Sequence, residues 1–227
     1  MMLVGSTSQA LCPLPFSSYD KMGCLSRAEG EPSTRSRPFD LTRKGFVFSE
    51  GSAFLVIETL ESALKRNAPI YAEILSYASI CNGEHLVELD PESPQLARVI
   101  RRAIKKAKVN RIDYIQAHGS STQQNDLLET NSIKNVFGKY AYEIPISSIK
   151  STIGHTTAAA SLLSVITSIG AIQRQEVPPT MHLHTPDPLC DLNYVPNSPL
   201  KHTVEYTLNI SSSFGGIHSA IILGKHS

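Results

Sequence analysis

The chain has 227 residues, 41% of them hydrophobic, which is enough to bury one good core or two smaller ones, so a disordered chain is excluded. Its 21 basic and 20 acidic residues leave a formal charge of +1, which argues against a nucleic-acid-binding protein. Its 4 cysteines show no metal-ligand spacing, and no stretch approaches the ~20 apolar residues of a membrane span. We therefore expect a cytoplasmic globular protein with no metal and no membrane span.

The first part of the chain has few regular elements. The pattern predicts an apolar strand at 1–4, a long irregular crossover rich in Gly, Pro and Ser at 5–39, a buried strand at 46–57 and a short helix at 59–66. The strand at 1–4 begins without a preceding turn, as if it belonged to a larger sheet. Long irregular crossovers of this kind often carry function.

From residue 70 onward, strands and helices alternate. Strands are predicted at 70–77, 112–117, 144–149, 204–210 and 217–223, and helices at 95–108, 127–137 and 156–174. Strands separated by helices imply right-handed crossovers and a mainly parallel sheet with helices on both faces. The predicted fold class is therefore α/β.

Two histidines follow neighbouring strands of this predicted sheet. His118 comes directly after the strand at 112–117, and Lys150 and His155 come after the strand at 144–149. The carboxyl ends of parallel strands meet at one edge of a sheet, where ligands bind in α/β proteins. A lone histidine is more often structural, but a pair in equivalent loops, each beside a glycine, favours a functional site.

A third segment lies between the last two predicted strands. Phe214 is followed there by Gly215 and Gly216, which permit a tight turn that directs backbone N–H groups at an oxyanion. Taken alone, this segment is equally consistent with an ordinary hairpin.

Together these segments resemble the motifs of β-ketoacyl synthases, condensing enzymes of the thiolase fold. His118-Gly-Ser-Ser-Thr-x-x-Asn-Asp with Glu129 is similar to HGTxTxxND…E, Lys150-Ser-x-x-Gly-His155 with Ala158-Ala159 to KSxxGHxxxAAG, and 213–216 to the closing GFGG loop. Upstream, 37–40 and 45–51 match RPFDxxRDGFVxGEGA, and 1–6 resemble the DxMLVGG strand. The resemblance implies that 1–69 form the tail of the N-terminal half and 70–227 the C-terminal half of a thiolase-like fold.

The resemblance also implies a reaction. In the family, a cysteine accepts an acyl group from an acyl carrier protein, a malonyl thioester loses its carboxylate, and the enolate attacks the acyl thioester in fatty acid or polyketide synthesis. His118 and His155 would stabilise the enolate oxygen, and Lys150, paired with Glu129, would orient the site. No resident cofactor is implied, because the phosphopantetheine arm arrives with the carrier protein.

The remaining expected roles follow from the same motifs. Ser120 and Thr122 would hold the phosphopantetheine arm, and Asp126 would support the site beside Glu129. Phe214, in the loop with Gly215 and Gly216, would be the gate beside the cysteine and would offer its N–H to the oxyanion. Acyl-chain length and pathway stay open.

The expected nucleophile lies upstream of residue 1 in the family. None of Cys12, Cys24, Cys81 and Cys190 sits in a small-residue elbow that leads into a helix, so each is expected to be a plain thiol. We therefore expect a partner, in a homo- or heterodimer, that supplies the cysteine half and covers an apolar surface at 1–4. A non-catalytic partner that resembles a chain-length factor, and an inactive truncated fragment, are the alternatives.

Several motif positions depart from the family pattern. Lys44 stands for Asp, Ser49 and Ser213 stand for Gly, Ile210 stands for Asn, and Ser161 stands for the Gly that closes the AAG turn. By contrast, Ser120 for the family's Thr keeps the hydroxyl.

Overall fold

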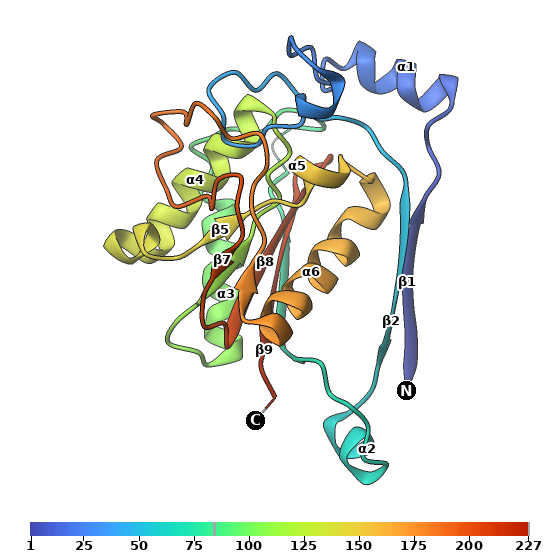
Figure 1. Cartoon of the computed structure of the whole chain (residues 1–227), viewed down its shortest axis with the longest axis vertical. Coiled ribbons are helices and arrows are strands. Elements are labelled where there is room, and N and C mark those ends of the chain that lie inside the picture. Colours follow the sequence, from blue (N-terminus) through green and yellow to red (C-terminus); the bar gives the residue numbers. More distant parts are fainter. Residues whose placement is uncertain (84, 227) are drawn as a thin grey trace.

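A computed structural model describes residues 1–83 and 85–226 (Figure 1). The strands are β1 Met2–Ser8, β2 Gly51–Ile57, β3 Glu73–Cys81, β4 Tyr114–Gln116, β5 Ile146–Ser147, β6 Glu176–Val177, β7 Leu200–Lys201, β8 Tyr206–Ser213 and β9 Ile217–Gly224. The α-helices are α1 Pro13–Lys21, α2 Leu60–Lys65, α3 Gln95–Ala107, α4 Gln123–Phe137, α5 Lys150–Ile153 and α6 Ala160–Arg174, and short 3₁₀ helices lie at Pro32–Thr34, Gly138–Tyr142 and Thr157–Ala159. Within the described ranges, no helix combines the length and the hydropathy needed to cross a membrane.

The main sheet is mixed and has the strand order β3-β9-β8-β4-β5. Strand β4 pairs with β5 and β8 in parallel, whereas β9 pairs with β8 and β3 in antiparallel fashion. The α/β class is confirmed, but parallel pairs account for only half of this sheet. Strand β9 follows β8 through a turn of a few residues, and such a short connection can join only antiparallel strands.

Helices cover both faces of the main sheet, as expected. Ile115 of β4 packs in one apolar cluster with Leu96 of α3 and Leu128 of α4. Its neighbour Tyr114 packs on the opposite face with Val165 of α6. Successive strand residues point to opposite faces, so burial of both residues shows that β4 is covered on both sides.

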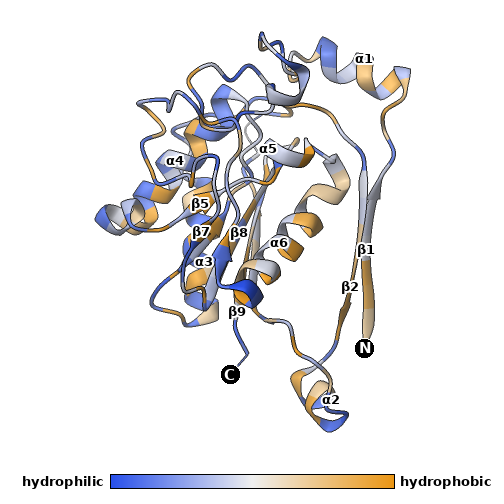
Figure 2. Cartoon of the chain, in the orientation of Figure 1, coloured by the Kyte–Doolittle hydropathy of each residue, from blue (hydrophilic) through white to orange (hydrophobic). Residues whose placement is uncertain are grey.

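Strands β1 and β2 form a separate antiparallel ribbon, and α6 lies between this ribbon and the main sheet (Figure 1). Alternate residues of the ribbon turn away from α6, and Leu3, Phe54 and Val56 are 60% to 67% exposed among them. Apolar residues gather in the N-terminal part of β1 and the C-terminal part of β2 (Figure 2). The expected apolar surface around 1–4 is therefore exposed, and it extends onto β2.

Four predicted element boundaries are wrong. Residues 5–39 are not wholly irregular, because they hold the end of β1 and helix α1, which begins with Pro13 at its first position and has no buried residue that would create an apolar pattern. The strand predicted at 46–57 is regular only in β2, and Phe46 and Phe48 form isolated bridges instead. Helix α4 begins before residue 127 because the Thr122 side chain caps it, and α6 begins later than predicted.

Candidate active site

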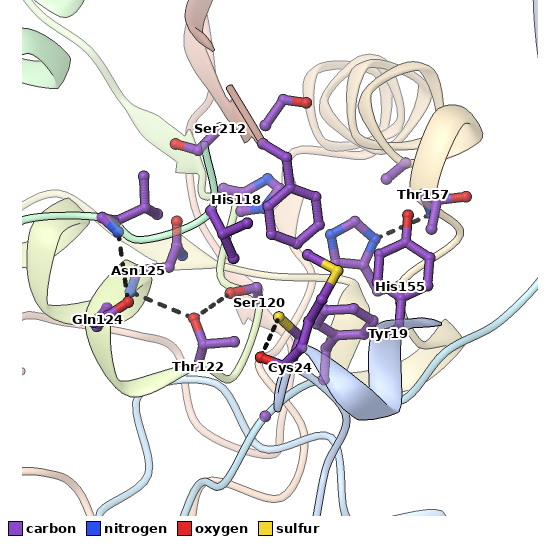
Figure 3. Close-up of a pocket in the computed structure, with 18 of the residues that line it drawn as sticks. Tyr19, Cys24, His118, Ser120, Thr122, Gln124, Asn125, His155, Thr157 and Ser212 are labelled. Atoms are coloured by element: carbon purple, nitrogen blue, oxygen red, sulfur yellow. Dashed lines mark hydrogen bonds between the residues drawn. The ribbon is translucent and has the colours of Figure 1, made fainter. Parts of the chain in front are cut away.

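A cavity of about 910 Å³ opens at the carboxyl edge of β4, β5 and β8 (Figure 3). Segments that are far apart in the chain contribute to its wall, including Tyr19 of α1, Phe46, His118, His155 and Phe214. The position agrees with the general rule that ligands bind beyond the carboxyl ends of strands in open α/β sheets.

The structure brings the two predicted histidines together at this cavity. The centroids of the His118 and His155 rings are 5.3 Å apart, and the ring planes meet at 73°. The parallel pairing of Ile115 with Ile146 places the ends of β4 and β5 side by side, which explains why the two following loops meet. Both rings line the same pocket (Figure 3).

The tautomer of His155 follows from its hydrogen bond. The backbone N–H of Thr157 donates to Nδ1 of His155 at 3.0 Å, so the neutral ring carries its proton on Nε2 (Figure 3). Burial, with the charge of Lys150 acting in the same direction, lowers the pKa of His155 to about 3. At neutral pH, His155 is therefore a neutral N–H donor.

His118 is also neutral at physiological pH. Its side chain is buried, and burial holds the pKa of His118 well below its ordinary value, with Lys150, His155 and His218 acting in the same direction. Two neutral imidazoles can donate hydrogen bonds to an oxygen atom that gains negative charge. In the part of the chain that the structure describes, no group of three or more His, Cys, Asp or Glu is placed to hold a metal ion.

No direct ion pair joins Lys150 to Glu129 in the described residues, which corrects the expected pairing, although their charges still act on each other. Nζ of Lys150 donates to the backbone carbonyl of His118 at 2.6 Å. Burial lowers the pKa of Lys150, and the carboxylates of Glu129 and Asp126 oppose this shift. The ammonium group of Lys150 therefore holds the loop that carries His118 through this hydrogen bond.

The carboxylate of Glu129 forms hydrogen bonds with the turn that follows β4. It accepts hydrogen bonds from the backbone N–H groups of His118 at 2.7 Å and Gly119 at 2.6 Å, and from Asn125 Nδ2 at 2.9 Å. Gly119 has φ +44°, and a Cβ atom there would lie 2.4 Å from Cβ of Ser148, so only glycine fits the turn. Burial raises the pKa of Glu129, and the backbone hydrogen bonds oppose this shift. Glu129 therefore shapes the turn, and it acts on Lys150 through its charge and not through a direct ion pair.

Asp126 also holds this turn, together with a residue that sequence reasoning missed. Its carboxylate accepts hydrogen bonds from the N–H groups of Phe39 at 2.9 Å and Ser121 at 3.2 Å. Arg43 lies 3.4 Å from the same carboxylate and donates to Asp187 at 2.6 Å. Arg43 belongs to the RPFDxxR segment, and this motif could have pointed to it as a site residue. Burial raises the pKa of Asp126, and Arg43 opposes this shift.

Ser120 and Thr122 both line the cavity, as expected for residues that would hold a substrate arm. Their hydroxyl oxygens are 2.9 Å apart (Figure 3). The Thr122 hydroxyl also accepts the N–H of Asn125 at 3.4 Å, which caps α4. Thr122 thus stabilises the start of α4, whether or not it also contacts a ligand.

Phe214, Gly215 and Gly216 form the turn between β8 and β9 at the cavity wall. Gly216 has φ +70°, a backbone conformation that favours glycine, and a Cβ atom there would also displace the side chain of Asn82. The N–H of Gly215 donates to the carbonyl of Leu86 at 2.7 Å and is already used. The ring of Phe214 faces the ring of Tyr19, with the two centroids 6.0 Å apart.

No sequence pattern predicted the cavity wall that α1 and the following loop form. Tyr19 packs its ring against Phe46 at 5.8 Å, and Cys24 also lines the cavity (Figure 3). The Cys24 thiol donates to the carbonyl of Met22 at 3.6 Å, and burial raises the pKa of this thiol. Cys24 is therefore held in the thiol form, which is a poor nucleophile.

The buried neutral histidines predict a loss of stability in mild acid. Unfolded histidines titrate near the ordinary pKa of about 6.5, whereas folded His118 and His155 have lowered pKa values. Stability is full above about pH 6.5, and below it the unfolded state takes up protons that the folded state does not, at up to about 1.4 kcal/mol per pH unit per histidine. Urea unfolding between about pH 7.5 and about pH 5.5 should show this fall, and His155→Gln should reduce the slope. Equal slopes for the two proteins would contradict the account.

Known proteins resemble the chain over almost its whole length. The family described as “Beta-ketoacyl synthase, C-terminal domain” matches residues 71–184, and the one described as “Beta-ketoacyl synthase, N-terminal domain” matches residues 1–63. The tetracenomycin polyketide synthase ketoacyl synthase alpha subunit of Streptomyces glaucescens is 39% identical over 227 residues, which cover 99% of this chain and 53% of that protein.

Two further comparisons agree. The 3-oxoacyl-[acyl-carrier-protein] synthase 2 of Coxiella burnetii is 38% identical over 99% of this chain and 55% of its own length. A solved type II polyketide synthase acyl-carrier protein in complex with its ketosynthase bound to the hexaketide contains a chain with TM-score 0.97 and 42% identity, over 100% of this chain and 56% of that one. The chain thus spans about half the length of the curated relatives it matches.

Proposed function

Because the chain belongs to the β-ketoacyl synthase family, we propose that it forms the histidine part of an active site for decarboxylative condensation of acyl and malonyl thioesters. One observation carries this proposal: the His118 and His155 rings lie 5.3 Å apart at the wall of one cavity. At this separation two ring N–H groups can reach the same carbonyl oxygen at about 3 Å each.

The proposed chemistry uses the neutral state of both rings. When a malonyl thioester loses carbon dioxide, negative charge moves onto the thioester oxygen, and the N–H donors stabilise this charge more strongly than the ground-state carbonyl. Each such donor typically contributes about 3–4 kcal/mol. The ammonium group of Lys150, held at the carbonyl of His118, adds positive potential to the same loop. Ser120 and Thr122 would bind the phosphopantetheine arm, so no resident cofactor is needed.

The nucleophilic cysteine is proposed to come from a segment or chain that forms the other half of the family's fold. The match to about half the length of the relatives supports this proposal, and so does the exposed apolar face of the β1–β2 ribbon, which a covering half would bury. Cys24 is the weaker candidate, because its thiol is occupied with Met22 and has a raised pKa.

The names of structural relatives support the proposed partners. One solved relative is an acyl-carrier protein in complex with its ketosynthase, and another is a ketosynthase/chain length factor. We therefore propose a carrier protein as the substrate donor and a dimeric assembly. A non-catalytic, chain-length-factor-like role is disfavoured, because a partner that only shapes a tunnel has no need of two converging imidazoles.

A complementation experiment tests this function. The full chain is mixed with a protein that carries the cysteine-bearing N-terminal half of a polyketide ketosynthase relative, and carbon dioxide release from malonyl carrier protein is measured. Release should exceed that of either protein alone, and Cys24→Ala should leave the gain intact. No gain, with complex formation verified by gel filtration, would count against the function, and loss of the gain in Cys24→Ala would make Cys24 the nucleophile.

A further inference from the structure

A serine and a histidine face each other where β8 and β9 reach the cavity. Ser212 of β8 is the register partner of His218 of β9, and Oγ of Ser212 lies 2.9 Å from Nδ1 of His218. Ser212 is 8% exposed and His218 is fully buried. Ser212 lines the same cavity as His118 (Figure 3). A hydroxyl group on the cavity wall is therefore hydrogen-bonded to a buried imidazole behind it.

This pair is polar on a strand face that is otherwise apolar. Side chains alternate between the two faces of a strand, so Leu208, Ile210 and Ser212 of β8 lie on one face. Leu208, Ile210 and their register partners on β9 all belong to the main apolar core. Burying a hydroxyl and an imidazole in this row is less favourable than burying two apolar side chains. Such departures from the core pattern occur chiefly at functional sites.

The sheet holds these two groups in position for proton transfer. Strand β9 lies between β3 and β8, and His218 pairs with Ile80 on one side and with Ser212 on the other, so its backbone is fixed from both sides. A serine hydroxyl becomes an effective nucleophile when an adjacent base takes its proton. In the tautomer with the proton on Nε2, Nδ1 of His218 accepts the proton of Ser212. This is the arrangement of a nucleophile and its general base.

Donors for an oxyanion lie in the same cavity. Strand β4 ends at Gln116, whereas its parallel neighbour β8 pairs there through Asn209 and continues, so Ser212 lies beyond the end of β4, as His118 does. Burial and then nearby charges lower the pKa of His118, and His218 is one of those charged groups, so the pair lies near the His118 ring. Attack on a thioester carbonyl puts negative charge on its oxygen, which the two neutral cavity imidazoles are suited to stabilise.

We propose that Ser212 and His218 form a catalytic dyad that hydrolyses thioesters bound in this cavity. This inference rests on the proposed function for the class of substrate and adds a second reaction to it. Oγ of Ser212 attacks the thioester carbonyl and gives its proton to His218, the C–S bond breaks, and His218 passes the proton to the leaving pantetheine sulfur. Water then attacks the acyl–Ser212 ester, and His218 takes a proton from the water and returns it to Oγ. The products are a carboxylic acid and the free pantetheine thiol.

Hydrolysis of butyryl-pantetheine by the full chain tests the dyad. This substrate has no carboxylate to lose, so chromatography of the released butyrate measures hydrolysis independently of decarboxylation. Ser212→Ala should lower the rate about 100-fold or more, and His218→Asn, which keeps a polar side chain beside Ser212 but removes the base, should lower it by a similar factor. A fluorophosphonate reagent should label Ser212 in the native chain, as located by peptide mass mapping, and should not label it in His218→Asn.

A neighbouring serine provides the matched control. Ser211 also lines the cavity but is hydrogen-bonded to Ser161, so Ser211→Ala should leave the rate and the labelling unchanged. Circular dichroism verifies the fold of each variant. If Ser212→Ala does not fold, Ser212→Cys keeps a nucleophile of similar size and should form a butyryl adduct at residue 212.

The two proposals fail in different ways. No hydrolysis by the native chain, or hydrolysis that survives in Ser212→Ala, would overturn the dyad. If the complemented enzyme releases carbon dioxide but the native chain does not hydrolyse butyryl-pantetheine, only the dyad is overturned. If hydrolysis depends on Ser212 and complementation gives no carbon dioxide, the dyad stands and the condensing function is overturned.

Discussion

Replacement of His155 by alanine should lower malonyl decarboxylation by the complemented enzyme about 100- to 1000-fold, the usual effect of removing one preorganised oxyanion donor. The reason is geometric: Thr157 fixes Nδ1 as an acceptor and leaves Nε2–H free to donate beside the ring of His118. His118→Ala should have an effect of the same order. The measurement is the rate of carbon dioxide release from malonyl carrier protein at saturating substrate, which reports kcat.

Two controls separate catalysis from folding in this experiment. His155→Asn keeps an N–H donor on a shorter side chain and should recover part of the lost rate. His202→Ala changes a histidine beside the amino ends of β4 and β5, at the opposite edge of the sheet, and should leave the rate unchanged. A His155→Ala enzyme with the native rate would mean that the two rings do not serve the reaction.

Replacement of Arg43 by methionine should lower the free energy of unfolding by about 3–5 kcal/mol, as expected when one partner of a buried ion pair is removed. The Arg43 side chain is 3% exposed and lies against the buried carboxylates of Asp126 and Asp187. Without the guanidinium, both carboxylates are left in a poorly solvated site. The loop 118–126 also loses the hydrogen bond that Arg43 donates to the carbonyl of Thr122. Urea unfolding followed by circular dichroism measures the change.

An exposed ion pair in the same chain provides the matched control. Arg27 and Asp20 are 2.9 Å apart, but their side chains are 69% and 52% exposed. Arg27→Met should therefore change the free energy of unfolding by less than about 1 kcal/mol. Similar losses for the two variants would show that burial of the Arg43 cluster does not set its contribution. If Arg43→Met cannot be purified folded, adding Asp126→Asn should restore part of the stability.

The buried contacts divide the motif residues into two groups. The rings of His118 and His155 line the cavity. The charged groups of Glu129, Asp126 and Arg43 instead form hydrogen bonds with backbone groups and an ion pair between Asp126 and Arg43. Substitutions in the second group should thus change stability and activity together. Substitutions of the histidines should change activity more than stability near neutral pH.

Much of this organisation was readable from the amino-acid sequence alone. Alternating apolar strands and helices from residue 70 onward predicted the α/β class, and the two histidines at strand ends predicted one common edge. Both inferences depend on local spacing, because the side-chain period of a strand and the end of a strand are properties of the chain itself.

The tertiary structure decided the partners of the buried groups. The sequence suggested Glu129 for Lys150, but Nζ of Lys150 donates to the carbonyl of His118, and Glu129 accepts hydrogen bonds from the turn. Helix α1 and its Tyr19 were missed, because a helix without buried residues carries no apolar period. A hydrogen bond or an ion pair forms with whichever group the fold brings within about 3 Å, and that distance depends on the packing of segments that are remote in sequence.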